Sequence, residues 1–408
     1  MLKWIDGGVC AAQGFQAAGI HVGVKSQNAE KKDLALIVSD VMCAAAAVYT
    51  TNAVKAAPIL IDQLHLADGK AQAIIANSGN ANACAPKGEE NAEKMCAAAA
   101  KALGLSPKNV VVSSTGVIGQ TLNISIIEAG VPTLVSSLSP TAVGSDAAAH
   151  AIMTTDTVKK EAAVETQVGG KTVCIGGIAK GSGMIHPNMG TMLCFLTTDC
   201  AISPAMIHAA LLDTVGVSFN RISVDGDTST NDTCCVLANG LAGNAEITEK
   251  NADYAAFVEA LQTLCIQLAK EMASDGEGAR HLMTCTVTGA ADTASAETLA
   301  KSVISSTLTK AAIFGADANW GRVLCALGYS GVDFDPNQVD VSFASAAGVI
   351  QVCAQGRGLD FDEDKAKTIL TEHDVEIQVS MGQGSGCCTC WGCDITYDYI
   401  KINGDYRT

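Results

Sequence analysis

The sequence predicts an α/β protein of the layered α+β type. Strand-like apolar runs and helix-like runs are mixed along the 408 residues, without the regular alternation that a repeated βαβ unit would give. Hydrophobic residues make up 48% of the chain and charged residues 17%, as is typical of a globular protein and not of a disordered one. Aromatic residues are only 4%, so we expect a core of small, closely packed side chains.

Short apolar runs predict the strands. In chain order, Leu34–Val38 reads as a buried strand, and Val110–Val112 reads as a short strand that ends in a turn at Ser113–Gly116. The other predicted strands are Lys171–Ile178, Met192–Leu196, His281–Thr288, Val375–Ser380 and Ile395–Ile402. In the last of these, polar and apolar residues alternate, which would place Tyr397 and Tyr399 on one face.

Two segments predict helices. Asn91–Leu103 is rich in Ala. Asp253–Met272 carries apolar residues every three or four positions, which is the period of an amphipathic helix. These residues are Phe257, Leu261, Leu264, Leu268 and Met272.

Charge and cysteine usage limit the partners and the compartment. The formal net charge of −16 argues against binding to nucleic acid or to an anionic membrane surface. No apolar run reaches the roughly 18 residues of a membrane span, and the N-terminus does not resemble a signal peptide. The 17 Cys lie mostly in apolar runs, which indicates buried thiols in a reducing compartment. We therefore expect a cytoplasmic protein.

The segment from Lys180 to Leu193 carries the most informative pattern. It reads Lys-Gly-Ser-Gly-Met-Ile-His-Pro-Asn-Met-Gly-Thr-Met-Leu, a Gly-rich stretch followed by Thr191 and an apolar run. The hydroxyl of Thr191 could attack the carbonyl of Gly190, and water would then release the ester. The new N-terminal Thr191 would hold a nucleophile and an α-amine base, with a pKa of about 7.7–8.0, in one residue.

A second candidate lies at Ser113–Gly119, where backbone N–H groups of a Gly-containing turn can stabilise an oxyanion. The alternative is a Ser/Thr-rich turn that caps a helix. Lys180 could be a solvated cation or a partner for a substrate carboxylate. Glu277, with Gly on both sides, could end a helix loop or could bind an ammonium group.

The block from Lys180 to Leu193 resembles that of the ornithine acetyltransferase (glutamate N-acetyltransferase) family of arginine biosynthesis. The resemblance extends from Gly7–Gly8 through Asp317–Arg322 to the C-terminal residues. It implies two β-sheet layers flanked by helices, in a self-cleaving precursor of the N-terminal-nucleophile type. Residues 1–190 would be the α chain and residues 191–408 the β chain, interleaved in one fold and assembled as a heterotetramer of two of each.

The resemblance also implies the reaction. Thr191 would take acetyl from N-acetylornithine, and glutamate would then take it from the acetyl-enzyme. Some members of the family also use acetyl-CoA as the donor, and the sequence leaves open whether this chain does. The resemblance implies no cofactor and no metal.

The family's functional residues carry over to matching positions of this chain. Thr115 and Gly116 would form the oxyanion hole, and Gly190–Thr191 would be the cleavage site. The substrate would contact Thr154, Lys180, Thr191, Glu277, Asn403 and Thr408.

Two segments resemble metal sites only weakly. Asp225–Asp232 imitates a calcium loop but has Thr230 where the motif needs Gly and Val236 where it needs Glu. Cys387–Cys393 contains one Cys-x-x-Cys pair without a second pair. Two other readings therefore stay open at this point: an N-terminal-nucleophile aminopeptidase or amidohydrolase, and a non-catalytic metal-binding protein organised by Cys387–Cys393.

Overall fold

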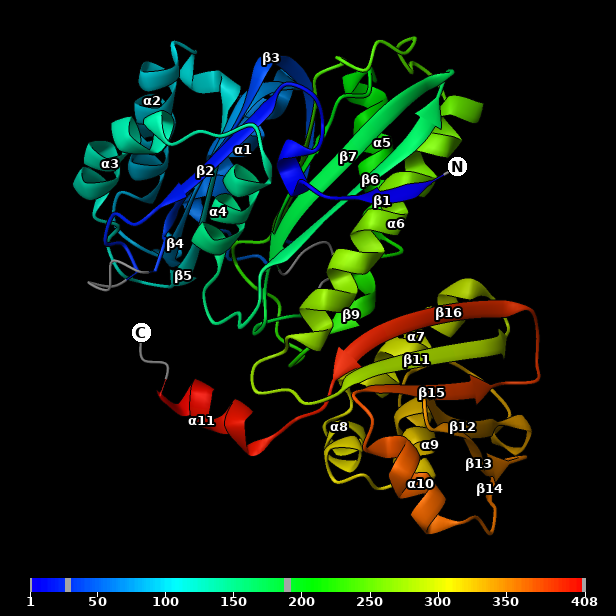
Figure 1. The fold of residues 1–408 in the computed structure, drawn as a ribbon. Coiled ribbons are helices and arrows are strands. Elements are labelled where there is room, and N and C mark those ends of the chain that lie inside the picture. The colour runs from blue at the N-terminus through cyan, green and yellow to red at the C-terminus, as the bar shows by residue number, and fades with distance from the viewer. Residues whose placement is uncertain (1, 26–30, 187–191, 406–408) are drawn as a thin grey trace.

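The computed structural model describes residues 2–25, 31–186 and 192–405 of the chain. Over these ranges the protein forms two mixed β-sheets, and helices cover both of them (Figure 1). The predicted α/β class is therefore confirmed.

The larger sheet contains nine strands in the described ranges, and its order places segments from both halves of the chain side by side. Neighbouring strands are antiparallel except for two parallel pairs, β8–β10 and β4–β5. In spatial order the strands are β1 (Lys3–Ile5), β6 (Lys160–Val168), β7 (Lys171–Lys180), β8 (Leu193–Thr198), β10 (Thr233–Ala238), β3 (Leu34–Tyr49), β4 (Lys70–Asn80) and β5 (Val110–Val117), and β2 (Phe15–Ile20) also pairs with β3.

Strand β8 lies inside this sheet and is buried along its whole length. It pairs with β7 on one side and with β10 on the other. A buried strand with two partners is expected to be continuously apolar, and Leu193–Leu196 fits this pattern. Strand β8, which begins two residues after Thr191 in the sequence, is therefore held firmly in the sheet.

The smaller sheet has its own hydrophobic core. Its order within the described residues is β14 (Arg357–Gly358), β13 (Gly348–Ala354), β12 (Asp340–Ser345), β15 (Asp374–Ser380), β11 (Leu282–Ala290), β16 (Gly386–Cys393) and β9 (Ile222–Ser223). The short strand β9 comes from the segment between β8 and β10, so the chain passes from the larger sheet to the smaller one and back.

The helices divide between the two sheets (Figure 1). Those beside the larger sheet are α1 (Ala57–His65), α2 (Gly88–Leu103), α3 (Ile124–Ser136), α4 (Ala142–Ile152), α5 (Pro204–Val215) and α6 (Ala252–Ser274). Those beside the smaller sheet are α7 (Thr293–Ser305), α8 (Thr307–Phe314), α9 (Trp320–Gly328) and α10 (Glu363–Leu370). The C-terminal α11 (Tyr397–Asp405) extends away from the smaller sheet.

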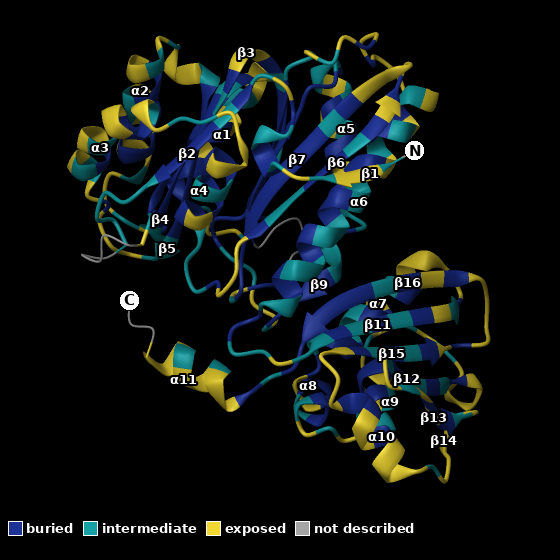
Figure 2. Cartoon of the chain, in the orientation of Figure 1, coloured by how far each residue is buried: buried dark blue, intermediate teal, exposed yellow. Residues whose placement is uncertain are grey.

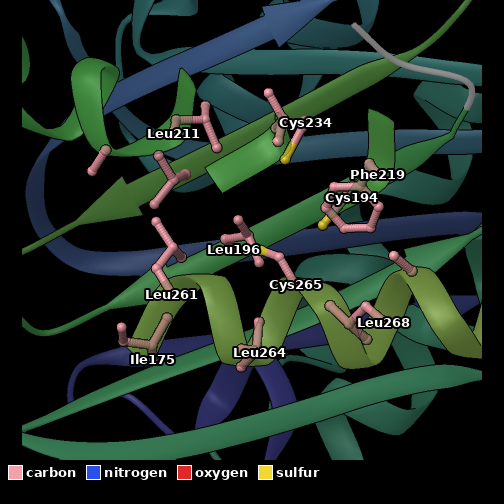
Figure 3. Packing of buried hydrophobic residues seen from close by; sticks show 14 of the residues in the cluster. Ile175, Cys194, Leu196, Leu211, Phe219, Cys234, Leu261, Leu264, Cys265 and Leu268 are labelled. Atoms are coloured by element: carbon pink, nitrogen blue, oxygen red, sulfur yellow. The ribbon is translucent and has the colours of Figure 1, made fainter. Parts of the chain in front are cut away.

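Helix α6 forms the main core contact of the larger sheet. Its apolar face packs on β6 and β7 and shares a hydrophobic cluster with β8 and β10, and Figure 3 shows Leu264, Cys265 and Leu268 of this helix close to Leu196 and Cys194. Figure 2 shows the same pattern at larger scale, with buried strands in the interior and exposed residues on the outer faces of the helices. Small residues such as Ala and Cys fill much of this core, as the low aromatic content predicts.

Most predicted elements are present, and several are longer than predicted. The helix predicted at Asp253–Met272 is α6, and the strands predicted at Leu34–Val38 and Lys171–Ile178 belong to β3 and β7. The turn predicted at Ser113–Gly116 is wrong, because β5 continues to Val117. Its parallel pairing with β4 extends through Ser114 and Thr115, and this long-range pairing overrides the local turn preference.

The strand predicted at Ile395–Ile402 is also wrong, because this segment contains α11. The hydroxyl of Thr396 accepts hydrogen bonds from the backbone N–H groups of Asp398 (3.1 Å) and Tyr399 (3.4 Å), which is an N-cap arrangement. Tyr397 is 83% exposed, so the alternation of apolar residues does not report a buried strand face. A Thr followed by an acidic residue in the first turn was the helix signal.

The packing of α6 yields a stability prediction. Replacing the fully buried Leu264 by Ala leaves a cavity under the larger sheet and should cost about 2–5 kcal/mol, so the midpoint of thermal unfolding should fall. Leu64→Ala on α1 is the matched control, because Leu64 is 69% exposed. Equal midpoints for the two variants in calorimetry would contradict this account of the core.

Candidate active site

A cavity of about 140 Å³ lies where β5 and β7 end and β8 begins. Six of the predicted site residues line it: Thr115, Gly116, Thr154, Lys180, Glu277 and Asn403. The remaining lining residues are Ile118, Thr155, Gly183, Met184, Met192, Leu193, Ser229, Asn231 and Asp232. The other predicted site residues, Gly190, Thr191 and Thr408, lie outside the described residues.

Thr115 and Gly116 bring the end of β5 to the cavity wall. Gly116 has a φ of +131°, and a Cβ at this position would lie 2.3 Å from the carbonyl carbon of Gly79 on β4. Only glycine fits such a close approach with this backbone conformation. The wall therefore presents bare backbone beside the Thr115 hydroxyl, and N–H groups in such a wall can stabilise an oxyanion.

Lys180, the last residue of β7, places a buried cation in the cavity. Its Nζ donates a hydrogen bond to the Thr115 hydroxyl at 3.4 Å. Burial lowers the pKa of Lys180 below its usual value, although Asp156 counteracts this effect. The solvated-cation reading of the sequence is therefore wrong, because desolvation makes this ammonium a strong partner for an anionic ligand.

The ammonium of Lys160, at the start of β6, connects three segments around the cavity. Lys160 is fully buried, and its Nζ lies 2.6 Å from Oδ1 of Asp156 and also bonds Asp275. Asp156 in turn accepts hydrogen bonds from the backbone N–H groups of Gly181 (2.7 Å) and Thr154 (3.0 Å). One ion cluster thus fixes the loop before β6, the chain after β7 and the end of α6.

The same cluster sets the charge of Asp156. Burial raises the pKa of this carboxyl, but the ammonium groups of Lys180 and Lys160 outweigh burial and hold the pKa below its usual range. Asp156 is therefore a carboxylate at neutral pH. It neutralises part of the buried positive charge of Lys160 and Lys180, because a buried ion without a partner of opposite charge is strongly destabilising.

Glu277 approaches the cavity from the loop after α6, two residues beyond Asp275. Its backbone N–H donates to the carbonyl of Ser182 at 2.8 Å, and its carboxylate accepts a hydrogen bond from Asn403 Nδ2 at 2.7 Å. A Cβ at Gly183 would lie 2.4 Å from the Glu277 carboxyl carbon, so glycine leaves room for this side chain. Asn403 belongs to α11, which brings the C-terminal segment to the site.

Lys180 and Glu277 give the cavity one buried cation and one nearly buried anion. A ligand that carries both a carboxylate and an ammonium group can pair with both of them. The cavity therefore has the charge pattern of an amino-acid site, beside a backbone wall suited to acyl chemistry.

Sequence reasoning missed four polar residues of the cavity wall, which are Thr155, Ser229, Asn231 and Asp232. Asn231 Nδ2 donates to the carbonyl of Ala81 (2.6 Å) and to that of Ser114 (2.8 Å), next to Thr115. Asp232 directly precedes the apolar strand β10. No strand was predicted at β10, and the segment Asp225–Asp232 was weighed as a calcium loop.

The two segments that resemble metal sites have other structural roles. Asp225 accepts hydrogen bonds from the backbone N–H groups of Met184 (2.6 Å) and Ile185 (2.9 Å), so it holds the chain that leads to the predicted cleavage position. Cys387 and Cys388 are neighbours on β16, one exposed and one buried. Within the described ranges, no group of three or more His, Cys, Asp or Glu residues could hold a metal ion.

Comparison with known proteins places the chain in a family. The model of the ArgJ family matches residues 16–408. The chain belongs to the ArgJ family. It is 52% identical over 408 residues to the arginine biosynthesis bifunctional protein ArgJ of Symbiobacterium thermophilum, and the match covers all of both chains. It is 48% identical to ArgJ 1 of Clostridium acetobutylicum, over 97% of this chain and 96% of that one.

Solved structures of ArgJ proteins match parts of the chain. The crystal structure of the arginine biosynthesis bifunctional protein ArgJ from Bacillus halodurans matches with 44% identity and a TM-score of 0.49, over 52% of this chain and 97% of that chain. The ornithine acetyltransferase of Mycobacterium tuberculosis, solved with ornithine, matches with 38% identity and a TM-score of 0.42, over 47% and 100%.

In the part of this ArgJ-family chain that the structure describes, no helix has the length and apolar character needed to cross a membrane.

The ion cluster of Lys160 yields a testable prediction. Lys160→Met leaves the carboxylates of Asp156 and Asp275 buried without their shared cation, which should destabilise the protein by about 3–5 kcal/mol at neutral pH. Since the lowered pKa of Asp156 contributes stability above its unfolded pKa of about 3.9, the difference from wild type should shrink as the pH falls below that value.

The neighbouring Lys159 provides the control for this experiment. Its ammonium pairs with Asp146 and Glu161 at the surface, and Lys159→Met should change stability by less than about 1 kcal/mol. Unfolding curves at several pH values compare the two variants. Similar stability of both variants at pH 7 would contradict the role assigned to Lys160.

Proposed function

We propose that this protein is an acetyltransferase of arginine biosynthesis that moves acetyl from N-acetylornithine to glutamate. The observation that carries the proposal is the cavity beside the start of β8, where a bare backbone wall, a buried Lys180 and Glu277 meet. The relatives named as arginine biosynthesis bifunctional proteins support the same activity.

The nucleophile is Thr191, which self-cleavage makes N-terminal. The Thr191 hydroxyl attacks the carbonyl carbon of Gly190, and the peptide nitrogen leaves as the α-amine while an ester forms. Water hydrolyses this ester and releases residues 1–190 as one chain and residues 191–408 as the other. Strands on either side of the cut remain paired, because β7 with β8 and β3 with β10 are neighbours in one sheet.

In the first half-reaction, the Thr191 hydroxyl attacks the acetyl carbonyl of N-acetylornithine, and the α-amine accepts the hydroxyl proton. The developing oxyanion is stabilised by the wall at Thr115 and Gly116. The C–N bond breaks, the proton passes to the leaving nitrogen, and ornithine departs. In the second half-reaction, the amine of glutamate attacks the acetyl ester and regenerates the free hydroxyl.

Substrate recognition relies on the buried charges. Lys180 pairs with a substrate carboxylate, while Glu277, oriented by Asn403, binds the side-chain ammonium group of N-acetylornithine. Thr154 and the C-terminal Thr408 complete the substrate contacts. Every step uses groups of the chain and water, so the proposal includes no cofactor and no metal.

The proposal extends to the donor range and the assembly. Acetyl-CoA serves as a second donor, so that the enzyme also acts as an amino-acid N-acetyltransferase. The names of the relatives as bifunctional proteins support this part. The two chains of the cut precursor assemble as a heterotetramer of two of each and act in the cytoplasm.

An acetyl-transfer assay with either N-acetylornithine or acetyl-CoA as the donor and glutamate as the acceptor tests the proposal. Wild type should form N-acetylglutamate, and Glu277→Gln should raise the KM for N-acetylornithine because it loses the charge that binds the side-chain ammonium group of that donor. Glu161→Gln, a substitution on β6 outside the cavity, is the matched control. Release of N-terminal amino acids from peptides, without acetyl transfer, would instead favour an aminopeptidase.

A further inference from the structure

A second pocket, of about 390 Å³, adjoins the active-site cavity. Thr154 lines both, and Asp156 of the ion cluster also lines the second pocket. The basic residues of this lysine pocket are Lys25, Lys31, Lys32 and His150. Since the chain has a formal net charge of −16, the pocket differs from the molecule as a whole in being a place that attracts anions.

The two acidic residues that line the lysine pocket already have cationic partners. Asp156 bonds Lys160, and Asp146 bonds Lys159, each at 2.6 Å. The ring of His150 also lies 3.4 Å from the carboxylate of Asp146. These carboxylates are therefore neutralised from outside the group of three lysines, and the pocket keeps a surplus of positive charge.

Lys31 and Lys32 supply charges that can reach a ligand. Lys31 is exposed and Lys32 is half-buried. Within the described residues, neither ammonium group forms an ion pair, and the contacts of these two residues run through their backbone carbonyls, to His21 and Lys25. The two side chains can therefore pair with an anion without first leaving a partner in the described part of the chain.

Lys25 connects the lysine pocket to the wall of the active-site cavity. A Cβ at Gly79 on β4 would lie 2.4 Å from the Cα of Lys25. Gly79 is the partner of Gly116 in the pairing of β4 with β5, and Gly116 belongs to the backbone wall of the cavity. The backbone of Lys25 thus packs on the strand that supports the wall, so the two pockets are adjacent here as well as at Thr154.

Lys25 is also a half-buried cation that a bound anion would stabilise. Burial lowers its pKa to about 8, Asp33 opposes this effect, and the positive charge of Lys31 adds to it. Asp33 is itself held by the backbone N–H groups of Val22 (2.6 Å) and Lys25 (3.0 Å). Since a nearby opposite charge favours the charged form of an amine, a bound anion and the protonated Lys25 would stabilise each other.

The small size of the active-site cavity makes a second pocket necessary for a large donor. Its volume of about 140 Å³ is below the roughly 300–1,000 Å³ of typical sites for drug-sized ligands, so the nucleotide part of acetyl-CoA has to lie outside it. That part carries a diphosphate and a 3′-phosphate. A strongly negative chain repels such a polyanion unless local positive charge meets the phosphates, and lysine binds phosphate as a point charge.

We propose that the lysine pocket binds the phosphate groups of acetyl-CoA, while the pantetheine arm passes Thr154 and carries the acetyl thioester into the active-site cavity. The inference rests on the proposed use of acetyl-CoA as a second donor. It gives the two donors different requirements. N-acetylornithine needs only the cavity, whereas acetyl-CoA needs the lysine pocket as well.

The double variant Lys31→Gln/Lys32→Gln tests this difference, because it removes two charges from side chains that the described core does not use. The KM for acetyl-CoA should rise by about tenfold, while the KM for N-acetylornithine should change little. S-acetylpantetheine, which has the same thioester but no phosphate, is the second probe. Its KM should be higher than that of acetyl-CoA in wild type, and the double variant should leave it unchanged.

Calorimetric titration with CoA makes the same comparison without catalysis. The Kd for CoA should rise by about tenfold in the double variant. In wild type the Kd should also rise with ionic strength, because salt screens the attraction between the lysines and the phosphates.

Lys365→Gln/Lys367→Gln is the matched control. Both lysines are exposed on α10, beside the smaller sheet, and lie outside the linings of both pockets. This variant changes the net charge by the same amount and should leave the KM for acetyl-CoA and the Kd for CoA unchanged. Equal effects in the two double variants would overturn the inference, because they would show a general effect of net charge.

Three other results would also overturn the inference. The first is an unchanged KM for acetyl-CoA and an unchanged Kd for CoA in Lys31→Gln/Lys32→Gln. The second is a rise confined to the KM for glutamate, which would assign the pocket to the acceptor. The third is a wild type that transfers acetyl from N-acetylornithine but neither uses acetyl-CoA nor binds CoA. Failure of the proposed function is distinguishable from all three, because wild type would then transfer acetyl from neither donor.

Discussion

The buried ammonium of Lys160 is the interaction on which the active site depends. It bonds Asp156 and Asp275, which lie on segments far apart in the sequence. Asp156 also accepts hydrogen bonds from the backbone N–H groups of Thr154 and Gly181, and Gly181 directly follows Lys180. Burying one ion is expensive, and a cluster of paired ions with satisfied hydrogen bonds is the way a protein can keep several charges at one site. Here the cluster lies next to Lys180, one of the charged residues that line the cavity.

The topology of the larger sheet explains how a cut chain can remain one molecule. Strands β3 and β7 precede the proposed cleavage position, and β10 and β8, which follow it, are their neighbours in the sheet. Helix α6 packs its apolar face across strands from both sides of that position. Breaking one peptide bond at the start of β8 would therefore release a terminus without separating the two parts. The new terminus would lie beside a cavity already lined by charged groups.

The sequence predicted correctly those helices and strands whose type follows from the pattern of apolar residues within one segment. The helical period of α6 and the apolar run of β8 were both recognised, and the resemblance to a known family along the whole chain gave the set of site residues that the cavity brings together. Helix α11 was mistaken for a strand because alternation in a short exposed segment carries no information about burial. The end of β5 was mistaken for a turn because its pairing partner lies on β4.

The supporting residues could not be predicted in the same way. Lys160 has partners 4 and 115 residues away, and no short motif links them. Asn231 holds the carbonyl of Ser114, 117 residues away, and Asp232 was hidden inside a segment that resembles a calcium loop. Such residues act through long-range contacts, so only the folded chain identifies them. Asn403 was named from the resemblance, but its hydrogen bond to Glu277 became visible only in the structure.

Mass spectrometry under denaturing conditions, before and after brief exposure to N-acetylornithine without an acceptor, tests the central claim most directly. The account predicts two chains in wild type, one beginning at Thr191, and one added acetyl group on that residue after exposure to the donor. Thr191→Ala should remain a single chain of 41.7 kDa without acetyl. A single intact wild-type chain, or acetyl on another residue, would contradict the assignment of Thr191 as the nucleophile.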